Sequence, residues 1–111
     1  MLCAMGKTSR QTSPKCPVER AAKIVGGRWT ALIMRDLLQK GRCRYQDFVH
    51  SLPGVPPNTL SDRLKMLEAH GIVERHVYDE HPLRADYVLT EKGRELGPII
   101  KAMRDWGMKH R

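Results

Sequence analysis

The sequence predicts a mainly α-helical fold that carries one small antiparallel β hairpin. Three observations lead to this prediction. Apolar residues recur at helical spacing in several segments, two extended segments rich in β-branched and aromatic residues follow one another after residue 71, and glycine or proline separates successive elements. The 111 residues are enough for one domain with a single core.

The first two predicted helices lie between residues 16 and 41. The first opens at Cys16-Pro17-Val18-Glu19, because a proline in the first turn loses no hydrogen bond, and it stops at Gly26-Gly27. The second runs from Trp29 to Leu38 with apolar residues at helical spacing and ends at Lys40-Gly41. We expect this second helix to lie in the core.

A short basic segment and a third helix come next. The segment Arg42-Cys43-Arg44 is predicted to be a link or an edge strand. Residues Tyr45 to Leu52 are predicted to form a helix anchored by Phe48 and Val49, and the turn at Pro53-Gly54 ends it.

The fourth predicted helix, from Pro57 to His70, has two contrasting faces. Leu60, Leu64 and Leu67 recur at i, i+4 and i+7, so they form one stripe that we expect to be buried. The other side is polar and consists of Asn58, Thr59, Ser61, Asp62 and Lys65, with Arg63 nearer the buried edge. Such a helix fits the major groove of DNA, whose base edges present hydrogen-bond donors and acceptors. An ordinary solvated surface explains the same residues equally well at this stage.

After Gly71, which ends the helix in the left-handed conformation, the sequence predicts a hairpin. Ile72 to Tyr78 and Ala85 to Thr90 are the expected strands, and Asp79 to Arg84, with Pro82, is the expected turn. A helix followed by such a hairpin is the core of a winged helix.

The wing of this fold would extend from His76 to Arg84. His81 and Arg84 lie near its tip, where a wing touches phosphate or the minor groove. Asp79 and Glu80 lie there as well, so we expect only limited phosphate contact.

The last predicted helix begins after Thr90, a suitable N-cap. Pro98 removes one N–H, which predicts a kink or a restart with Pro98 in the first turn. The apolar residues lie along one face: Leu96, Ile99, Ile100, Met103, Trp106 and Gly107. Part of this stripe should pack on the chain's own core. We expect Ile99, Ile100, Met103 and Trp106, together with Val18 of the first helix, to contact a second subunit in a two-fold homodimer.

The charge of the chain fits a polyanionic partner. The formal net charge is +8 and the pI is near 9.8, which supports nucleic acid and an anionic membrane about equally. The excess lies towards the ends: residues 1–20 hold four basic and one acidic side chain, residues 91–111 hold six and three, and the middle holds ten and eight. The basic side chains that would enlarge a binding surface if they converge are Arg42, Arg44, Arg63, Lys65 and Arg84.

Membrane insertion and export have no support in the sequence. No stretch approaches the ~20 apolar residues of a spanning helix, so such a helix is excluded. Residues 1–15, which contain Lys7, Arg10 and Lys15, are predicted to be a flexible basic tail and not a signal peptide.

Several motifs in a fixed order resemble the HxlR-type winged helix-turn-helix transcriptional regulators. They are CPVERAAKIVGGRWT (residues 16–30), YQDFVHSLPGVPPNTLSDRLKMLEAHGIVER (residues 45–75), YVLTEKGREL-P (residues 87–98) and Trp106 near the end. The resemblance implies a small bacterial or archaeal DNA-binding dimer, in which Pro57 to His70 is the recognition helix and the hairpin is the wing.

The sequence departs from this family at one position. Members often have Ser or Thr as the N-cap immediately before the proline that starts the recognition helix, whereas this chain has Pro56. Proline has no side-chain oxygen for the free N–H groups of the first turn. Either the Asn58 side chain or a DNA phosphate could accept hydrogen bonds from these N–H groups instead.

Three cysteines, an odd number in a short chain, argue against a disulfide framework and for a reducing cytoplasm. Cys16 precedes a helix N-terminus, where the helix dipole and the nearby Lys15 and Arg20 favour a thiolate. Cys16 is therefore a candidate redox sensor, and the resemblance implies the same, because some family members sense oxidants or reactive carbonyls through a cysteine near this position. The alternative is a small apolar capping residue at the dimer interface. Cys43 is a candidate resolving thiol.

Neither catalysis nor metal binding is expected. Gly26-Gly27 has no preceding strand and is no phosphate-binding loop, while Ser51, Ser61 and His50 are interpreted as polar residues on helix surfaces. The cysteines and histidines lack ligand spacings such as C-x₂-C or H-x₃-H.

The sequence thus predicts a cytoplasmic, homodimeric winged helix-turn-helix regulator, formed by residues 16–111, that reads a near-palindromic site on double-stranded DNA without a cofactor or metal. No small-molecule effector is assigned. The alternative is a winged-helix module that binds a protein or RNA partner. A steep fall of duplex-DNA affinity with salt, and a preference for one palindrome over random sequence, would separate the two.

Overall fold

The computed structural model describes residues 16–80 and 83–111. The predicted basic tail and His81 lie outside these described residues. The elements in chain order are α1 (Pro17–Val25), α2 (Arg28–Lys40), β1 (Arg42–Arg44), α3 (Tyr45–Ser51), α4 (Pro57–Ala69), β2 (Val73–Glu80), β3 (Leu83–Leu89), α5 (Glu91–Arg94) and α6 (Gly97–Lys109). The predicted fold class, mainly helical with a small antiparallel sheet, is confirmed.

The strands form a three-stranded antiparallel sheet with the order β1-β3-β2. β1 pairs only with β3, which confirms the edge strand predicted for Arg42-Cys43-Arg44. The hairpin is longer than the sequence indicated, because Asp79 and Arg84 pair with each other across the ladder where a turn was expected. An ion pair of 3.9 Å between Arg84 Nε and Asp79 Oδ2 accompanies this pairing.

Helix α2 forms the centre of the core and contacts α1, α3, α4, α6, β1 and β3. Ile33, Met34 and Leu37 give it a fully buried face. The predicted stripe of α4 packs in the same cluster, because Leu60, Leu64 and Leu67 are at most 2% exposed. Burying each such side chain stabilises the fold by roughly 1.5 to 3 kcal/mol.

The anchoring of α3 differs from the prediction. Phe48 is completely buried, but Val49 is 38% exposed and does not anchor the helix. Leu52 takes that position at 1% exposed. Residues 48 and 52 are four apart and share one helix face, whereas residue 49 lies about 100° away from it.

One buried carboxylate joins α2 to α3. Asp36 is 2% exposed and accepts a hydrogen bond from Arg35 Nη2 at 2.9 Å. The Ser51 hydroxyl, expected to lie on a helix surface, also donates to Asp36. These two bonds compensate the cost of burying the carboxylate and hold the end of α3 against α2.

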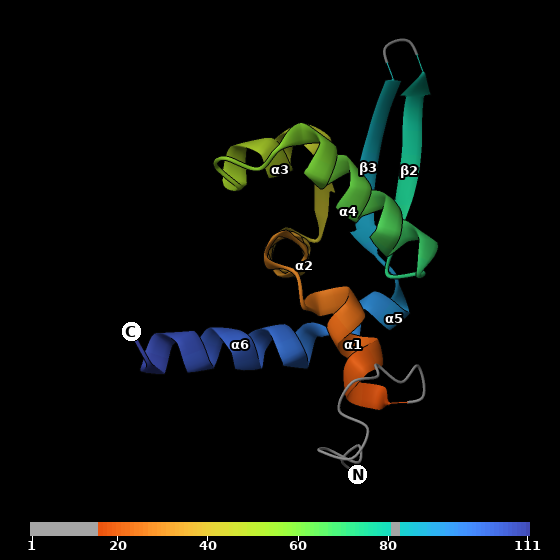
Figure 1. Ribbon diagram of the computed structural model, residues 1–111. Coiled ribbons are helices and arrows are strands. Elements are labelled where there is room, and N and C mark those ends of the chain that lie inside the picture. The colour runs from red at the N-terminus through yellow and green to blue at the C-terminus, as the bar shows by residue number, and fades with distance from the viewer. Residues whose placement is uncertain (1–15, 81–82) are drawn as a thin grey trace.

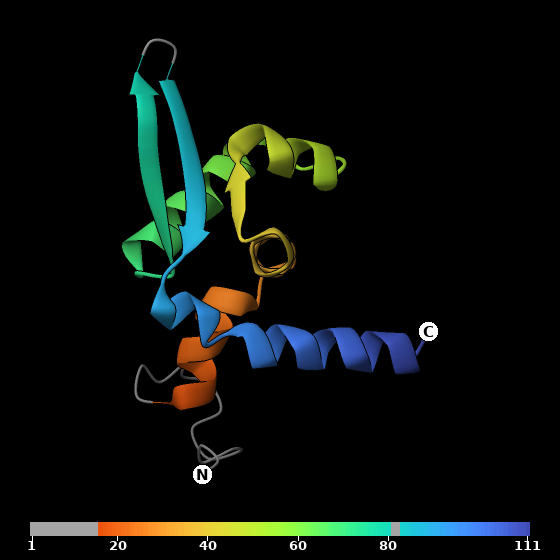
Figure 2. The same ribbon diagram turned by 180° about the vertical axis from the view of Figure 1, so that it is seen from behind.

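The C-terminal segment forms two helices. Thr90 caps α5, because its Oγ1 accepts a hydrogen bond from the Gly93 N–H at 3.0 Å. Pro98 lies in the first turn of α6, which confirms the predicted restart. Figures 1 and 2 show α6 extending past α2 and away from the hairpin, which projects from another side of the molecule.

Thr90 also joins α5 to the end of α4. Its hydroxyl donates to the Gly71 carbonyl at 2.6 Å, and its backbone N–H donates to the Ile72 carbonyl at 3.0 Å. Gly93 is buried beside the same backbone, where an added Cβ would lie 2.2 Å from the Ile72 oxygen. The base of the hairpin therefore has no room for a side chain at residue 93.

The helices described for residues 16–80 and 83–111 include none with the length and apolar character that crossing a bilayer requires.

We predict that Gly93→Ala lowers the free energy of unfolding by about 1 to 3 kcal/mol, because its methyl group would overlap a backbone carbonyl that cannot move freely. Gly107→Ala is the control: residue 107 has open space around it, so alanine there should raise stability by up to about 1 kcal/mol through its helix propensity. Urea unfolding followed by circular dichroism measures both. Equal midpoints for Gly93→Ala and the parent chain would contradict the packing argument.

Candidate nucleic-acid interface

The outward face of α4 is polar over its first two turns. Asn58, Asp62 and Lys65 are exposed, whereas Thr59 and Ser61 are half-buried. The buried leucine stripe fixes this orientation, because it turns the opposite side of the helix to solvent. Of the residues predicted to read bases, Asn58 and Asp62 are the most accessible.

The N-terminus of α4 begins without a side-chain cap at Pro56. No hydrogen bond of the Asn58 side chain replaces the cap among the described residues. The Pro56 carbonyl accepts from the Leu60 N–H at 3.0 Å, which closes the first turn. The alternative in which Asn58 caps the helix is therefore absent from this structure.

Ser61 is oriented towards α3. Its hydroxyl lies 3.5 Å from the hydroxyl of Tyr45, and the Tyr45 hydroxyl donates to the Pro57 carbonyl at 3.3 Å. Tyr45 thus links the start of α3 to the start of α4. The sequence pattern did not indicate this link, because it joins two helices across the turn at residues 52–56.

A cleft of about 390 Å³ separates α4 from the hairpin. We call it the α4–hairpin cleft; its lining residues are Tyr45, Ser61, Lys65, Glu68, Arg75, Ala85 and Tyr87. Arg75 and Tyr87 are cross-strand partners in the register of the sheet. Sequence reasoning missed both residues. Strand alternation does place Arg75 on the same face as the buried Val73, and that was the available signal.

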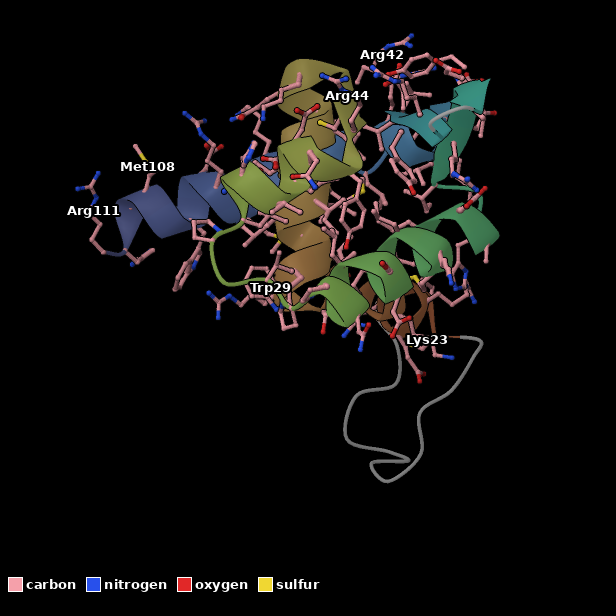
Figure 3. The ribbon with its side chains drawn as sticks, turned by 90° about the horizontal axis from the view of Figure 1, so that it is seen from above. Lys23, Trp29, Arg42, Arg44, Met108 and Arg111 are labelled. Carbon is pink, nitrogen blue, oxygen red and sulfur yellow. The ribbon has the colours of Figure 1, made fainter. Side chains whose placement is uncertain are left out.

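The five basic residues that would enlarge a binding surface if they converged do not gather at one place. Figure 3, a view from above, shows Arg42 and Arg44 together beyond α3, away from α4. Arg42 pairs with Asp86 at 2.7 Å. A hydrogen bond with Tyr78 raises the pKa of Arg44, and Asp47 adds to that effect. Arg84 is exposed and paired with Asp79, one of the two carboxylates from which limited phosphate contact of the wing was predicted.

Arg63 lies beside the turn between α1 and α2. Its Nε would be 3.9 Å from a Cβ built on Gly27, and the residue is half-buried. This position suits a side chain that braces the domain better than one that reads a base.

The two cysteines among the described residues have different environments. Cys43 is free and 1% exposed, and burial raises the pKa of its thiol to about 11. A thiol with that pKa is protonated at neutral pH and is a poor resolving thiol. Cys16 is half-buried at the N-cap of α1 and is disulfide-bonded, and Cys43 is not its partner because Cys43 is free. The odd number of cysteines argued against a disulfide framework, so the sequence did not indicate this bond.

A second surface carries exposed apolar side chains. Val18 on α1 is 61% exposed, and on α6 Ile99 is 39%, Met103 46% and Trp106 66% exposed. Ile100, expected at the same surface, is 8% exposed and belongs to the chain's own core. An apolar groove of about 380 Å³ runs between α2 and α6, and Leu32, Leu38, Ile100 and Met103 are among its lining residues.

The chain matches the model of the HxlR-like helix-turn-helix family over residues 24–111. It is 39% identical over 97 residues to the HTH-type transcriptional regulator sll1512 of Synechocystis, which covers 87% of this chain and 71% of that protein. The redox regulator HypR in its oxidised form is similar in structure, with a TM-score of 0.81, 38% identity and coverage of 86% of this chain and 98% of HypR. For the reduced transcriptional regulator YodB of Bacillus subtilis the TM-score is 0.72, the identity 35% and the coverage 90% and 95%.

The chain therefore belongs to the HxlR-like helix-turn-helix family. It is a winged helix-turn-helix transcriptional regulator that binds DNA, and its family is not one of enzymes.

Proposed function

We propose that the chain acts as a cytoplasmic homodimer that binds a near-palindromic site on double-stranded DNA. In this proposal α4 enters the major groove and the hairpin lies on the adjacent backbone or minor groove. The observation that carries it is the exposure of Asn58, Asp62 and Lys65 directly opposite the buried leucine stripe of α4. Short polar side chains such as Asn58 and Asp62 read base edges at the start of a recognition helix, whereas Lys65 contacts a phosphate.

The remaining predicted contacts have backbone roles in this proposal. Thr59 and Ser61 are half-buried and hold the helix start close to a phosphate. Arg63 braces the domain. Arg84 leaves its ion pair with Asp79 and contacts a flanking phosphate when DNA binds. His81 stays a predicted wing contact outside the described residues.

Dimerisation would bury the apolar side chains of α6 that the chain itself leaves exposed. Residues 101–111 are all exposed, although Met103 and Trp106 would be expected to avoid water. Exposed apolar surfaces of this kind mark interfaces. The apolar groove between α2 and α6 is continuous with Met103, so a second copy can bury Ile99, Met103, Trp106 and Val18 together with the groove.

Cys16 links this dimer to the redox state. It stands at the start of α1, two residues before Val18, and is disulfide-bonded in this structure. The structural similarity to the redox regulator HypR supports the same role. Forming or breaking the disulfide at Cys16 would shift α1 relative to the second subunit. This shift would change the distance between the α4 helices of the two subunits.

Selection of duplexes from a random pool tests the proposed function. We predict that Asn58→Ala and Asp62→Ala relax the sequence preference, each lost base contact costing about 1 to 3 kcal/mol. Lys65→Gln should weaken binding to all duplexes by a similar factor and lower the slope of log affinity against log salt concentration by about one unit. Binding of all three variants to the selected duplex as tightly as the parent would disprove the placement of α4. Preference of the parent for RNA or a protein would favour the alternative winged-helix module.

We predict that Trp106→Glu produces a monomer, because a carboxylate cannot be buried unpaired at the interface. Met108→Glu is the matched control: Met108 is 56% exposed and lies about 200° around the helix from Trp106, so this variant should stay dimeric. Sedimentation at micromolar concentration measures both. A dimeric Trp106→Glu variant would place the interface elsewhere.

We predict that mild oxidation, applied after the Cys16 disulfide has been reduced, changes operator affinity in the parent and in Cys43→Ala but not in Cys16→Ser. Cys43 is buried with its pKa raised to about 11, so its thiol should contribute nothing to the response. Operator titrations before and after peroxide, repeated after reduction, provide the comparison. An equal response in the parent and in Cys16→Ser would leave Cys16 a structural residue.

A further inference from the structure

The α4–hairpin cleft brings together two cations that have no acidic partner. Lys65 lines it from α4 and Arg75 lines it from β2. Neither side chain forms an ion pair with another residue in the described part of the chain. The cations elsewhere on the sheet differ, because Arg42 pairs with Asp86 and Arg84 with Asp79. Two unpaired cations on facing walls of one cleft favour an anion between them.

Tyr87 adds a hydrogen-bond donor to the same cleft. Its ring packs edge-on against Phe48, with ring centroids 6.2 Å apart, which holds the side chain in place. Burial raises the pKa of its phenol, so the hydroxyl keeps its proton at neutral pH. Among the described residues this hydroxyl has no hydrogen-bond acceptor. The nearby Arg75 acts to lower the pKa of the phenol, and burial outweighs this effect.

The position of the cleft identifies the anion. In Figures 1 and 2 the hairpin stands beside α4, and the cleft lies between these two elements. The proposed function places α4 in the major groove and the hairpin on the adjacent backbone or minor groove. The DNA strand that separates those two grooves must then cross between α4 and the hairpin, and its phosphates are the anions that reach the cleft.

We propose that the α4–hairpin cleft binds one backbone phosphate of this strand through Lys65, Arg75 and the Tyr87 hydroxyl. Arg75 and Tyr87 are thereby assigned as DNA contacts in addition to the residues of α4 and the wing. Arg75 makes a charge-assisted contact from the base of the hairpin, and Tyr87 donates a neutral hydrogen bond. This proposal rests on the proposed function and names a contact of the same interface.

Glu68 provides an internal test. It lines the cleft and influences the phenol of Tyr87 in the opposite sense to Arg75. A carboxylate there opposes a phosphate, so removing its charge should strengthen DNA binding. Two substitutions in one cleft are therefore expected to act in opposite directions, which a general loss of folding cannot imitate.

The experiment titrates the selected duplex at several salt concentrations with the full chain. Arg75→Gln should weaken binding about five- to ten-fold and lower the salt slope by about one unit, with the preference over random duplex retained. Tyr87→Phe should weaken binding about three-fold without a change in slope. Glu68→Gln should tighten binding. Arg111→Gln is the matched control, because Figure 3 places Arg111 at the far end of α6, and it should behave as the parent does.

A second series locates the phosphate. Uncharged methylphosphonates replace the phosphates of the duplex one at a time. At one position the methylphosphonate should lower the affinity of the parent for the duplex. The same substitution should not lower the affinity of Arg75→Gln any further. A salt slope for Arg75→Gln equal to that of Arg111→Gln, or the absence of any such position, overturns the cleft assignment and leaves the proposed function intact. Failure of the parent to prefer any duplex overturns both.

Discussion

The burial of one leucine stripe against α2 determines which side of α4 faces solvent. Leu60, Leu64 and Leu67 are part of the core. Rotating α4 about its axis would expose them to water, which would cost several kcal/mol of folding free energy. The polar residues of the opposite side are held outward by this cost and not by contacts of their own. A recognition surface built in this way keeps its side chains free for DNA, and it owes its rigidity to the core behind it.

The junction around Thr90 transmits that rigidity to the hairpin. Thr90 forms hydrogen bonds with the carbonyls of Gly71 and Ile72, and Gly93 packs against the Ile72 backbone, so the end of α4, the base of β2 and the start of α5 are in direct contact. These contacts hold the base of the hairpin next to the end of α4, beside the α4–hairpin cleft. The same junction directs the chain away from the sheet, so α6 leaves the domain on the side opposite the proposed DNA contacts.

The described residues form two chemically different surfaces, one on α4 and the hairpin and one on α1 and α6. The α4 and hairpin surface is polar and charged, whereas α6 and α1 present apolar side chains that the chain itself leaves uncovered. Cys43 is buried in the core and burial raises the pKa of its thiol, whereas Cys16 stands at the N-cap of α1, which also carries the exposed Val18. In the proposed function, a signal at Cys16 reaches DNA through the relative placement of the two subunits.

The sequence by itself determined the local elements: the period of the leucines defined α4, Pro98 restarted the last helix, and the glycines set the ends of α1, α2 and α4. The family motifs indicated the function for the same reason, since they are contiguous in the chain. Tertiary structure decided what depends on distant partners. It exposed Val49, separated Arg42 and Arg44 from α4, buried Cys43 and Ile100, and paired Arg75 with Tyr87 beside Lys65. Spacing along a chain specifies which side chains share a face of one element, but contacts between elements depend on how those faces pack.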